Sequence, residues 1–227
     1  MPWSRQLASA LAVALVAPLL VSAQNPVLVP AKFTVVLDAA HGGDETGAQL
    51  ASGVPEKTAT LALSARLRSL LAARGFGVVT TRDTDTALDP DRRAAIANHA
   101  NAGACLIVHF TASGSGVHIF TSALTPRPAE RFLPWKTAQS AFVARSVALS
   151  GLLNSTLTQT GITVTLGSAN LSGLDSMTCP AVAIEIAPER GPNGAIISQP
   201  FDPDYETRVA SALAASLLTW RQQERAK

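Results

Sequence analysis

The stretch FTVVLDAAHGG, residues 33–43, does most to indicate how this chain folds. It begins with an apolar run rich in β-branched residues and ends in a pair of glycines, a pattern typical of a buried strand that leads into a glycine loop. His41 is therefore expected at the C-terminal edge of a strand. In open α/β sheets ligands bind at that edge, which makes His41 a candidate site residue.

Strand-like and helix-like segments alternate along the rest of the chain. Between residues 56 and 74 leucines recur at helical spacing and Gly75 follows as a stop, so a helix is expected to open at Glu56. Asp89-Pro90 offers an N-cap and then a proline at the first helical position, for a helix that continues to residue 100. The other expected elements are strands at 76–81, 104–110, 162–166 and 181–186, a strand at 116–121 that could pair as a hairpin across the turn at 113–115, a surface loop at 124–135, and helices at 138–153 and about 204–220. This alternation predicts a single-domain α/β fold with a mostly parallel or mixed sheet flanked by helices on both faces.

The composition limits the class of protein. The chain has 227 residues, of which 47% are hydrophobic and 15% charged, enough to bury one substantial core and too apolar for a disordered or fibrous protein. The formal net charge is +2, and it falls by one if Arg5 is removed with the N-terminal segment. So small a charge gives no support for nucleic-acid binding.

Residues 1–23 have the features of a secretory signal peptide. A short segment with Arg5 precedes an apolar stretch at 7–21, and Val-Ser-Ala before Gln24 suits cleavage after Ala23. An uncleaved membrane anchor is the less favoured alternative, because the apolar run is shorter than the ~20 residues that span a bilayer and contains Pro18. We therefore expect an exported protein with a linker at 24–32, one folded domain at 33–220, a polar tail at 221–227 and no membrane span after cleavage.

Cys105 and Cys179 are the cysteines of the chain. One pair excludes the small disulfide-rich scaffolds, although an exported chain could still oxidise it. A pair can bridge only if its Cα atoms lie within ~7 Å, which sequence does not reveal. Two buried thiols are the preferred interpretation, and a bonded pair is the alternative.

Three residues with zinc-ligand chemistry fall where the expected sheet would gather them. His41 follows the first strand, Glu56 opens a helix, and His109 ends a central strand. Two imidazoles and one carboxylate, with water, make a tetrahedral zinc site that keeps one open position. Glu185 ends another buried apolar strand, where an unpaired carboxylate is costly unless a metal, a cation or hydrogen bonds stabilise it.

The neighbouring polar residues are harder to assign. Asp38 could accept a hydrogen bond from the His41 ring and so orient it, or it could be an ordinary strand-end carboxylate. His99 and His118 are expected in surface or structural roles, although His118 is close enough in sequence to line the cleft. Arg93 is expected to hold its helix to the rest of the domain.

Several segments, in order along the chain, together resemble one enzyme family. They are 35–43 (VVLDAAHGG), 56–57 (EK) before an amphipathic helix, 81–85 (TRDTD), 93–98 (RAAIAN), 106–109 (LIVH) and 180–185 (PAVAIE). The chain is similar in these segments to the zinc-dependent N-acetylmuramoyl-L-alanine amidases of the AmiA, AmiB and AmiC type. The resemblance implies one catalytic zinc ion held by His41, Glu56 and His109, with Glu185 as the catalytic glutamate.

The resemblance also implies a substrate and a location. The expected reaction is hydrolysis of the amide between N-acetylmuramic acid and L-alanine in peptidoglycan or its muropeptides, in the periplasm or outside the cell, with the need for an activator protein left open. Other zinc peptidases share this ligand set, and a wall-binding module that has lost turnover would share the fold. The family's usual residues are replaced at Ala40, Phe110, Thr111 and Ala187, which bears on substrate fit more than on metal binding.

Overall fold

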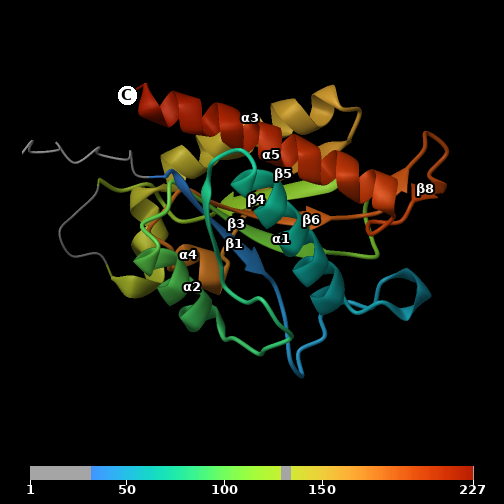
Figure 1. The fold of residues 1–227 in the computed structure, drawn as a ribbon, viewed down its shortest axis with the longest axis horizontal. Coiled ribbons are helices and arrows are strands. Elements are labelled where there is room, and N and C mark those ends of the chain that lie inside the picture. Colours follow the sequence, from blue (N-terminus) through green and yellow to red (C-terminus); the bar gives the residue numbers. More distant parts are fainter. Residues whose placement is uncertain (1–31, 129–133, 227) are drawn as a thin grey trace, which may run out of the picture. The chain divides into compact units, whose positions relative to one another are not determined.

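The computed structural model describes residues 32–128 and 134–226, so the expected signal peptide and most of the linker lie outside the described residues. In this part of the chain, six strands form one sheet in the order β2-β1-β3-β6-β4-β5 (Figure 1). Their bounds are β1 Thr34–Ala39, β2 Gly77–Thr80, β3 Ala104–Phe110, β4 Val117–Ser122, β5 Val164–Ala169 and β6 Ala181–Ile186. The β4–β6 pair is antiparallel and the other neighbours are parallel, which confirms the expected mixed sheet.

Helices cover both faces of this sheet, as predicted. They are α1 Glu56–Ala72, α2 Pro90–His99, α3 Val143–Gln159, α4 Ser172–Asp175 and α5 Pro203–Arg225, with 3-10 turns at Ala51–Gly53 and Trp135–Ala141. α1, α3 and α5 pack on one face, and the shorter α2 and α4 on the other (Figure 1). A separate hairpin joins β7 Glu189–Arg190 to β8 Ile196–Ser198. Among the described residues, no helix is both long and apolar enough to cross a bilayer.

Side-chain alternation along the strands creates two cores. In β3, Leu106 and Val108 face the larger core under α1, α3 and α5, whereas Cys105 and Ile107 face the smaller core under α2 and α4. This follows from the period of two in a strand, which sends successive side chains to opposite faces. Because the central strands β1, β3 and β6 are buried on both faces, they read in sequence as continuous apolar runs.

Most of the expected helices and strands are found close to their predicted bounds. β3 and β6 match residue for residue, and α1 opens at Glu56 as predicted. The Asp89 cap is confirmed, since its Oδ1 accepts a hydrogen bond from the N–H of Arg92 at 2.7 Å. Gly75 has the positive φ, 77°, that a stop after a helix requires.

The pairing of the strand after the Ser113 turn was predicted wrongly. β4 does not form a hairpin with β3, because β6 lies between them and pairs with both. The turn at 113–115 therefore connects strands that are not neighbours. β6 comes about seventy residues later in the chain, and nothing local to residues 104–121 indicates that it will enter there.

The region after residue 134 also departs from expectation. Instead of one helix from 138, a 3-10 segment at Trp135–Ala141 precedes α3, with a kink at Thr137 (φ −130°), and Phe142 separates the segment from α3. The buried amide of Gln139 anchors this segment, since its Nε2 donates to the carbonyls of Met177 and Cys179, both at 3.0 Å. The short α4 and the β7–β8 hairpin were not predicted, and residues 129–133 of the expected loop lie outside the described ranges.

Cys105 and Cys179 form a disulfide, so the preference for two free thiols was wrong. Their Cα atoms lie 6.2 Å apart, within the range that a disulfide spans. The cause is strand register: β3 pairs with β6 so that Cys105 stands opposite Ala181, and this brings the residues just before β6 alongside Cys105. Both cysteines are buried in the smaller core.

Candidate active site

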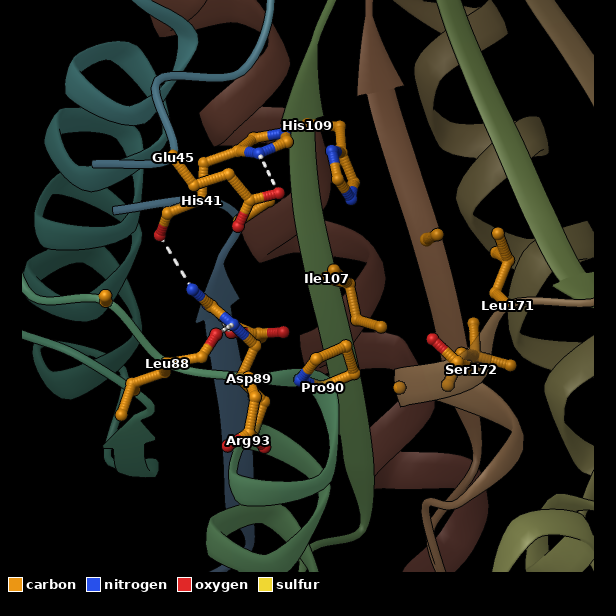
Figure 2. A pocket seen from close by; sticks show the side chains of 16 residues that line it. His41, Glu45, Leu88, Asp89, Pro90, Arg93, Ile107, His109, Leu171 and Ser172 are labelled. Atoms are coloured by element: carbon orange, nitrogen blue, oxygen red, sulfur yellow. Dashed lines mark hydrogen bonds and ion pairs between the residues drawn. The ribbon is translucent and has the colours of Figure 1, made fainter. Parts of the chain in front are cut away.

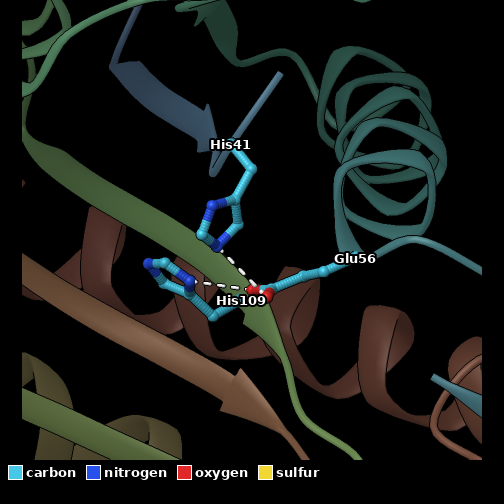
Figure 3. Close-up of side chains that lie close together, drawn as sticks. All are labelled: His41, Glu56 and His109. Carbon is cyan, nitrogen blue, oxygen red and sulfur yellow. Dashed lines mark hydrogen bonds and ion pairs between the residues drawn. The ribbon is translucent and has the colours of Figure 1, made fainter. Parts of the chain in front are cut away.

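His41, Glu56 and His109 meet at the C-terminal edge of the sheet (Figure 3). Each offers one ligand-type atom, and these atoms all lie within 4.8 Å of one another. Three separate elements bring them together: His41 follows β1, Glu56 is the first residue of α1, and His109 lies near the end of β3. The structure therefore assembles the three residues that the sequence singled out as ligands.

Glu56 lies at the centre of this cluster and is almost fully buried. Its Oε2 is 3.1 Å from Nε2 of His41, and its Oε1 is 2.9 Å from Nδ1 of His109. The backbone N–H groups of Ala48 and Phe110 also donate to the carboxylate, at 2.8 and 3.1 Å. Burial by itself raises the pKa of Glu56, but the hydrogen bonds from His109, His41 and the backbone outweigh it and hold that pKa well below its ordinary value. The hydrogen bond to Glu56 likewise raises the pKa of His41, against the effect of burial.

Gly47 packs closely against the cluster and leaves no space for a side chain at its own position. Gly47 has φ +67°, and a Cβ there would stand 2.6 Å from Oε2 of Glu56 and 2.6 Å from Cδ2 of His41. His41 itself adopts φ 62°, a strained conformation for a residue with a side chain, and such strain tends to occur at functional sites. Two imidazole nitrogens and a carboxylate held this closely match the donor set of a zinc ion with an open position.

Two buried arginines hold the backbone around His41. Arg93 donates to the carbonyls of Ala39 and His41 and to Oδ1 of Asp38, each at 2.7 Å. Arg82 donates to the carbonyl of Ala39 at 2.8 Å. Because Arg93 belongs to α2, it ties this helix to the end of β1, in keeping with its expected structural role.

Asp38 has partners other than the one considered for it. Its Oδ1 accepts hydrogen bonds from Oγ1 of Thr81, at 2.5 Å, and from Arg93, so it acts on the backbone near His41 and not on the ring. The carboxylate beside the His41 ring is Glu45, whose Oε1 lies 3.2 Å from Nδ1 without hydrogen-bond geometry. Glu45 was not among the predicted site residues, because it gives no signal beyond its place in the glycine loop.

Glu185 stands in β6 between two histidines on neighbouring strands. It is opposite His109 in the parallel β3–β6 pair and opposite His118 in the antiparallel β4–β6 pair. We call His109, Glu185 and His118 the polar row. Nδ1 of His118 lies 2.8 Å from Oε2 of Glu185, and the side chain of Glu185 is 35% exposed while that of His118 is 17% exposed. His118 was expected in a surface or structural role, and its contact with Glu185 becomes visible only once β6 is placed beside β4.

His99 lies away from this row. It ends α2, and its Nδ1 is 2.7 Å from the carbonyl of Ala95 in the preceding turn of the same helix. The expectation of a surface role fits this position.

A cavity of about 680 Å³ opens beside the cluster (Figure 2). In that view His41 and His109 lie at one end, Ile107 lies between, and Leu171 and Ser172 line the part near α4. Ala183 also lines the cavity. Ala40, one of the replaced family residues, also lines it. Phe110, another, is buried in the larger core on the opposite face. A substrate group in the cavity would therefore meet both apolar side chains and charged ones, with the two imidazoles at one end.

Comparison with known proteins agrees with this geometry. A family model described as N-acetylmuramoyl-L-alanine amidase matches residues 35–217. The chain is 29% identical over 126 residues to amidase AmiC of Neisseria meningitidis, covering 53% of this chain and 30% of that protein. It is 37% identical over 78 residues to AmiA of Escherichia coli, covering 34% of this chain and 27% of that protein, so it spans less than a third of either relative.

The fold has close counterparts among solved structures. Amidase AmiC2 of Nostoc punctiforme superposes with a TM-score of 0.65 at 23% identity, covering 85% of this chain and 98% of that one. At this identity the likeness concerns the fold. The family match, however, extends from β1 through all later strands of the central sheet into α5. On that match, this chain belongs to the N-acetylmuramoyl-L-alanine amidase family.

Proposed function

We propose that this protein is a zinc-dependent hydrolase that cleaves the amide between N-acetylmuramic acid and the L-alanine of the stem peptide in peptidoglycan. The observation that carries the proposal is the His41–Glu56–His109 cluster with Glu185 on the strand next to His109, in a chain of the amidase family. Neither a metal-binding motif nor a buried carboxylate alone would indicate this reaction.

In this proposal His41, Glu56 and His109 hold the ion. When bound, zinc supplies Lewis-acid polarisation of the scissile carbonyl and makes water a nucleophile at neutral pH. Glu56 contributes a negative charge, and the backbone N–H groups of Ala48 and Phe110 donate to its carboxylate and hold it in place. Gly47 keeps the space next to the ligands free, and Arg93 fixes the backbone of the His41 loop.

Glu185 is the proposed acid and base. Its carboxylate takes the proton from the attacking water and then delivers it to the nitrogen of the leaving amine, so that the C–N bond breaks and L-alanine leaves with a free amino group. Its partial exposure on the open side of the sheet gives it access to water and substrate. The cavity beside His41 and His109 provides the place for the group that is bound next to the scissile amide.

We also propose that the protein works outside the cytoplasmic membrane, where peptidoglycan lies. The signal-peptide features of residues 1–23 support export. The Cys105–Cys179 disulfide supports it independently, because disulfides persist mainly in oxidising compartments such as the periplasm and the extracellular space.

The test joins metal analysis with product analysis. Purified protein should contain zinc at near-stoichiometric level and should release stem peptides with a free N-terminal L-alanine from purified sacculi, as identified by mass spectrometry. His109→Ala should lose both the zinc and the release. His99→Ala, a histidine away from the cluster, should keep both.

Two results would overturn the proposal. Cleavage of plain peptides without release of free stem peptides would assign another peptidase activity. Full folding with no bound zinc and no release would assign a binding module.

A further inference from the structure

We propose that His118 is a positioning residue for Glu185: its ring N–H donates to one carboxylate oxygen and fixes the direction of the other. This inference rests on the proposed function, in which Glu185 exchanges a proton with water. Since an ionised carboxylate only accepts hydrogen bonds, the 2.8 Å contact requires Nδ1 of His118 to carry the proton. Oε2 is then occupied, and Oε1 is the oxygen left for the reaction.

The backbone places these two side chains together. His118 and Glu185 are directly opposite in the antiparallel β4–β6 pair, where Cβ atoms on one face lie about 4.5–5.5 Å apart. Glu185 is also opposite His109 in the β3–β6 pair, so His118 stands on the far side of Glu185 from the metal cluster. His118 is not a member of that cluster. Its contact with Glu185 therefore acts on the carboxylate and not on the ligands.

The loop before β4 holds the His118 ring from its other edge. Gly114 has φ +82°, and a Cβ there would stand 2.6 Å from Cε1 and 3.0 Å from Nε2 of His118. This loop is fixed in turn, because the carbonyl of Gly114 accepts from Nε of Arg190 at 2.9 Å and Gly116 exchanges hydrogen bonds with the residues after β6. Phe120 meets the ring edge to face at 6.5 Å between centroids.

These contacts make the ring a rigid donor. The 17% exposure of His118 leaves its ring little freedom to turn away, whereas Glu185 at 35% exposure would have several rotamers available without a partner. Proton transfer depends on close control of such geometry. Hydrogen-bond partners that orient metal ligands typically change activity about 10–100-fold when they are removed, and we expect a loss of the same order here.

The first test separates the hydrogen bond from the packing of the ring. His118→Phe keeps a ring of similar size and removes the donor, whereas His118→Asn keeps an amide nitrogen at the position of Nδ1. On a soluble muropeptide, His118→Phe should lower kcat about 10–100-fold with KM and zinc content unchanged. His118→Asn should recover most of the rate, and His99→Phe should be indistinguishable from the unaltered protein.

A double substitution asks whether His118 acts through Glu185. In a Glu185→Ala background, His118→Phe should cause no further loss of kcat, because the group that it positions is already absent. Equal losses in both backgrounds would overturn the inference, as would an unchanged kcat in His118→Phe.

A spectroscopic measurement keeps this inference separate from the amidase proposal. In protein labelled with ¹⁵N-histidine, the neutral His118 ring should be the Nδ1–H tautomer, and Glu185→Ala should shift its Nδ1 resonance. This result is expected even if the protein fails to cleave muropeptides, a failure that would count against the reaction and not against the hydrogen bond. An Nε2–H tautomer that Glu185→Ala leaves unchanged would overturn the positioning role.

Discussion

On one face of the central sheet, α1, α3 and α5 bury the strands along their length; on the other, the shorter α2 and α4 leave the polar row open. Both faces are made from the same strands. In β6, Ile184 and Ile186 are fully buried in the larger core, while Glu185 between them is partly exposed on the opposite side. Strand alternation thus lets adjacent residues serve stability and chemistry separately.

The largest expected effects test this separation on neighbouring residues. Glu185→Ala should lower kcat for muropeptide cleavage about 10²–10⁴-fold, the usual contribution of a general acid–base group, with zinc content and unfolding free energy nearly unchanged. Ile184→Ala should instead lower the unfolding free energy by about 2–5 kcal/mol, because it opens a cavity in the larger core, and should leave kcat of the folded protein close to normal. Steady-state kinetics and urea unfolding measure the two quantities.

The contrast between the two faces would be wrong if Glu185→Ala left kcat unchanged or if Ile184→Ala lowered it. Undiminished peptidoglycan release by Glu185→Ala would remove the catalytic role of the polar row. A large fall in kcat for folded Ile184→Ala would show that the larger core also sets the geometry of the site.

The next effect concerns the stability of the open face. This face has the smaller core, and the Cys105–Cys179 bond closes a separation of 74 residues within it. Cys105→Ala together with Cys179→Ala should lower the unfolding free energy by about 2–4 kcal/mol, since the cross-link restricts the unfolded chain. Reduction of the unaltered protein should cause a similar loss. Unchanged urea midpoints after both treatments would show that the smaller core is stable without the bond.

The smallest expected effect concerns the outer side of α3, one of the helices that cover the larger core. Gly151 is exposed within this helix, and a Cβ there would meet nothing within 4 Å. Gly151→Ala should raise the unfolding free energy by about 0.5–1 kcal/mol through helix propensity and leave kcat unchanged. Differential scanning calorimetry measures the stability and steady-state kinetics measures kcat. A lower melting temperature would show that this position does not accept a Cβ, contrary to the open space around it.

The helices and strands that are marked by a local sequence pattern were predictable. β3 and β6 were found to the residue because each is a buried apolar run, and α1 and α2 because leucine spacing and the Asp89 cap mark them. His41, Glu56, His109 and Glu185 were candidates because each lies at one end of such a segment, and their ligand and catalytic roles came from the family resemblance. The rule that parallel strands share a carboxyl edge accounts for the meeting of His41 and His109, and Glu56 joins them because α1 begins at that edge.

Features that depend on distant pairing were not predictable. The Cys105–Cys179 bond and the contact of His118 with Glu185 both follow from the entry of β6 beside β3 and β4. No local sequence pattern indicates that β6 lies between β3 and β4. A hairpin is the simplest expectation for two strands joined by a short turn. Glu45 was missed because a loop carboxylate gives no periodic signal.

The place of β6 also has a consequence for how the molecule assembles. β3 and β4 are close in the chain, but in the sheet they are joined through β6, which comes much later in the sequence. Contacts between residues so far apart in the chain are slow to form. A nascent chain that ends before residue 181 lacks both the central strand and Glu185. Completion of the sheet and completion of the polar row are therefore one event, so a partly folded chain carries no finished reactive centre.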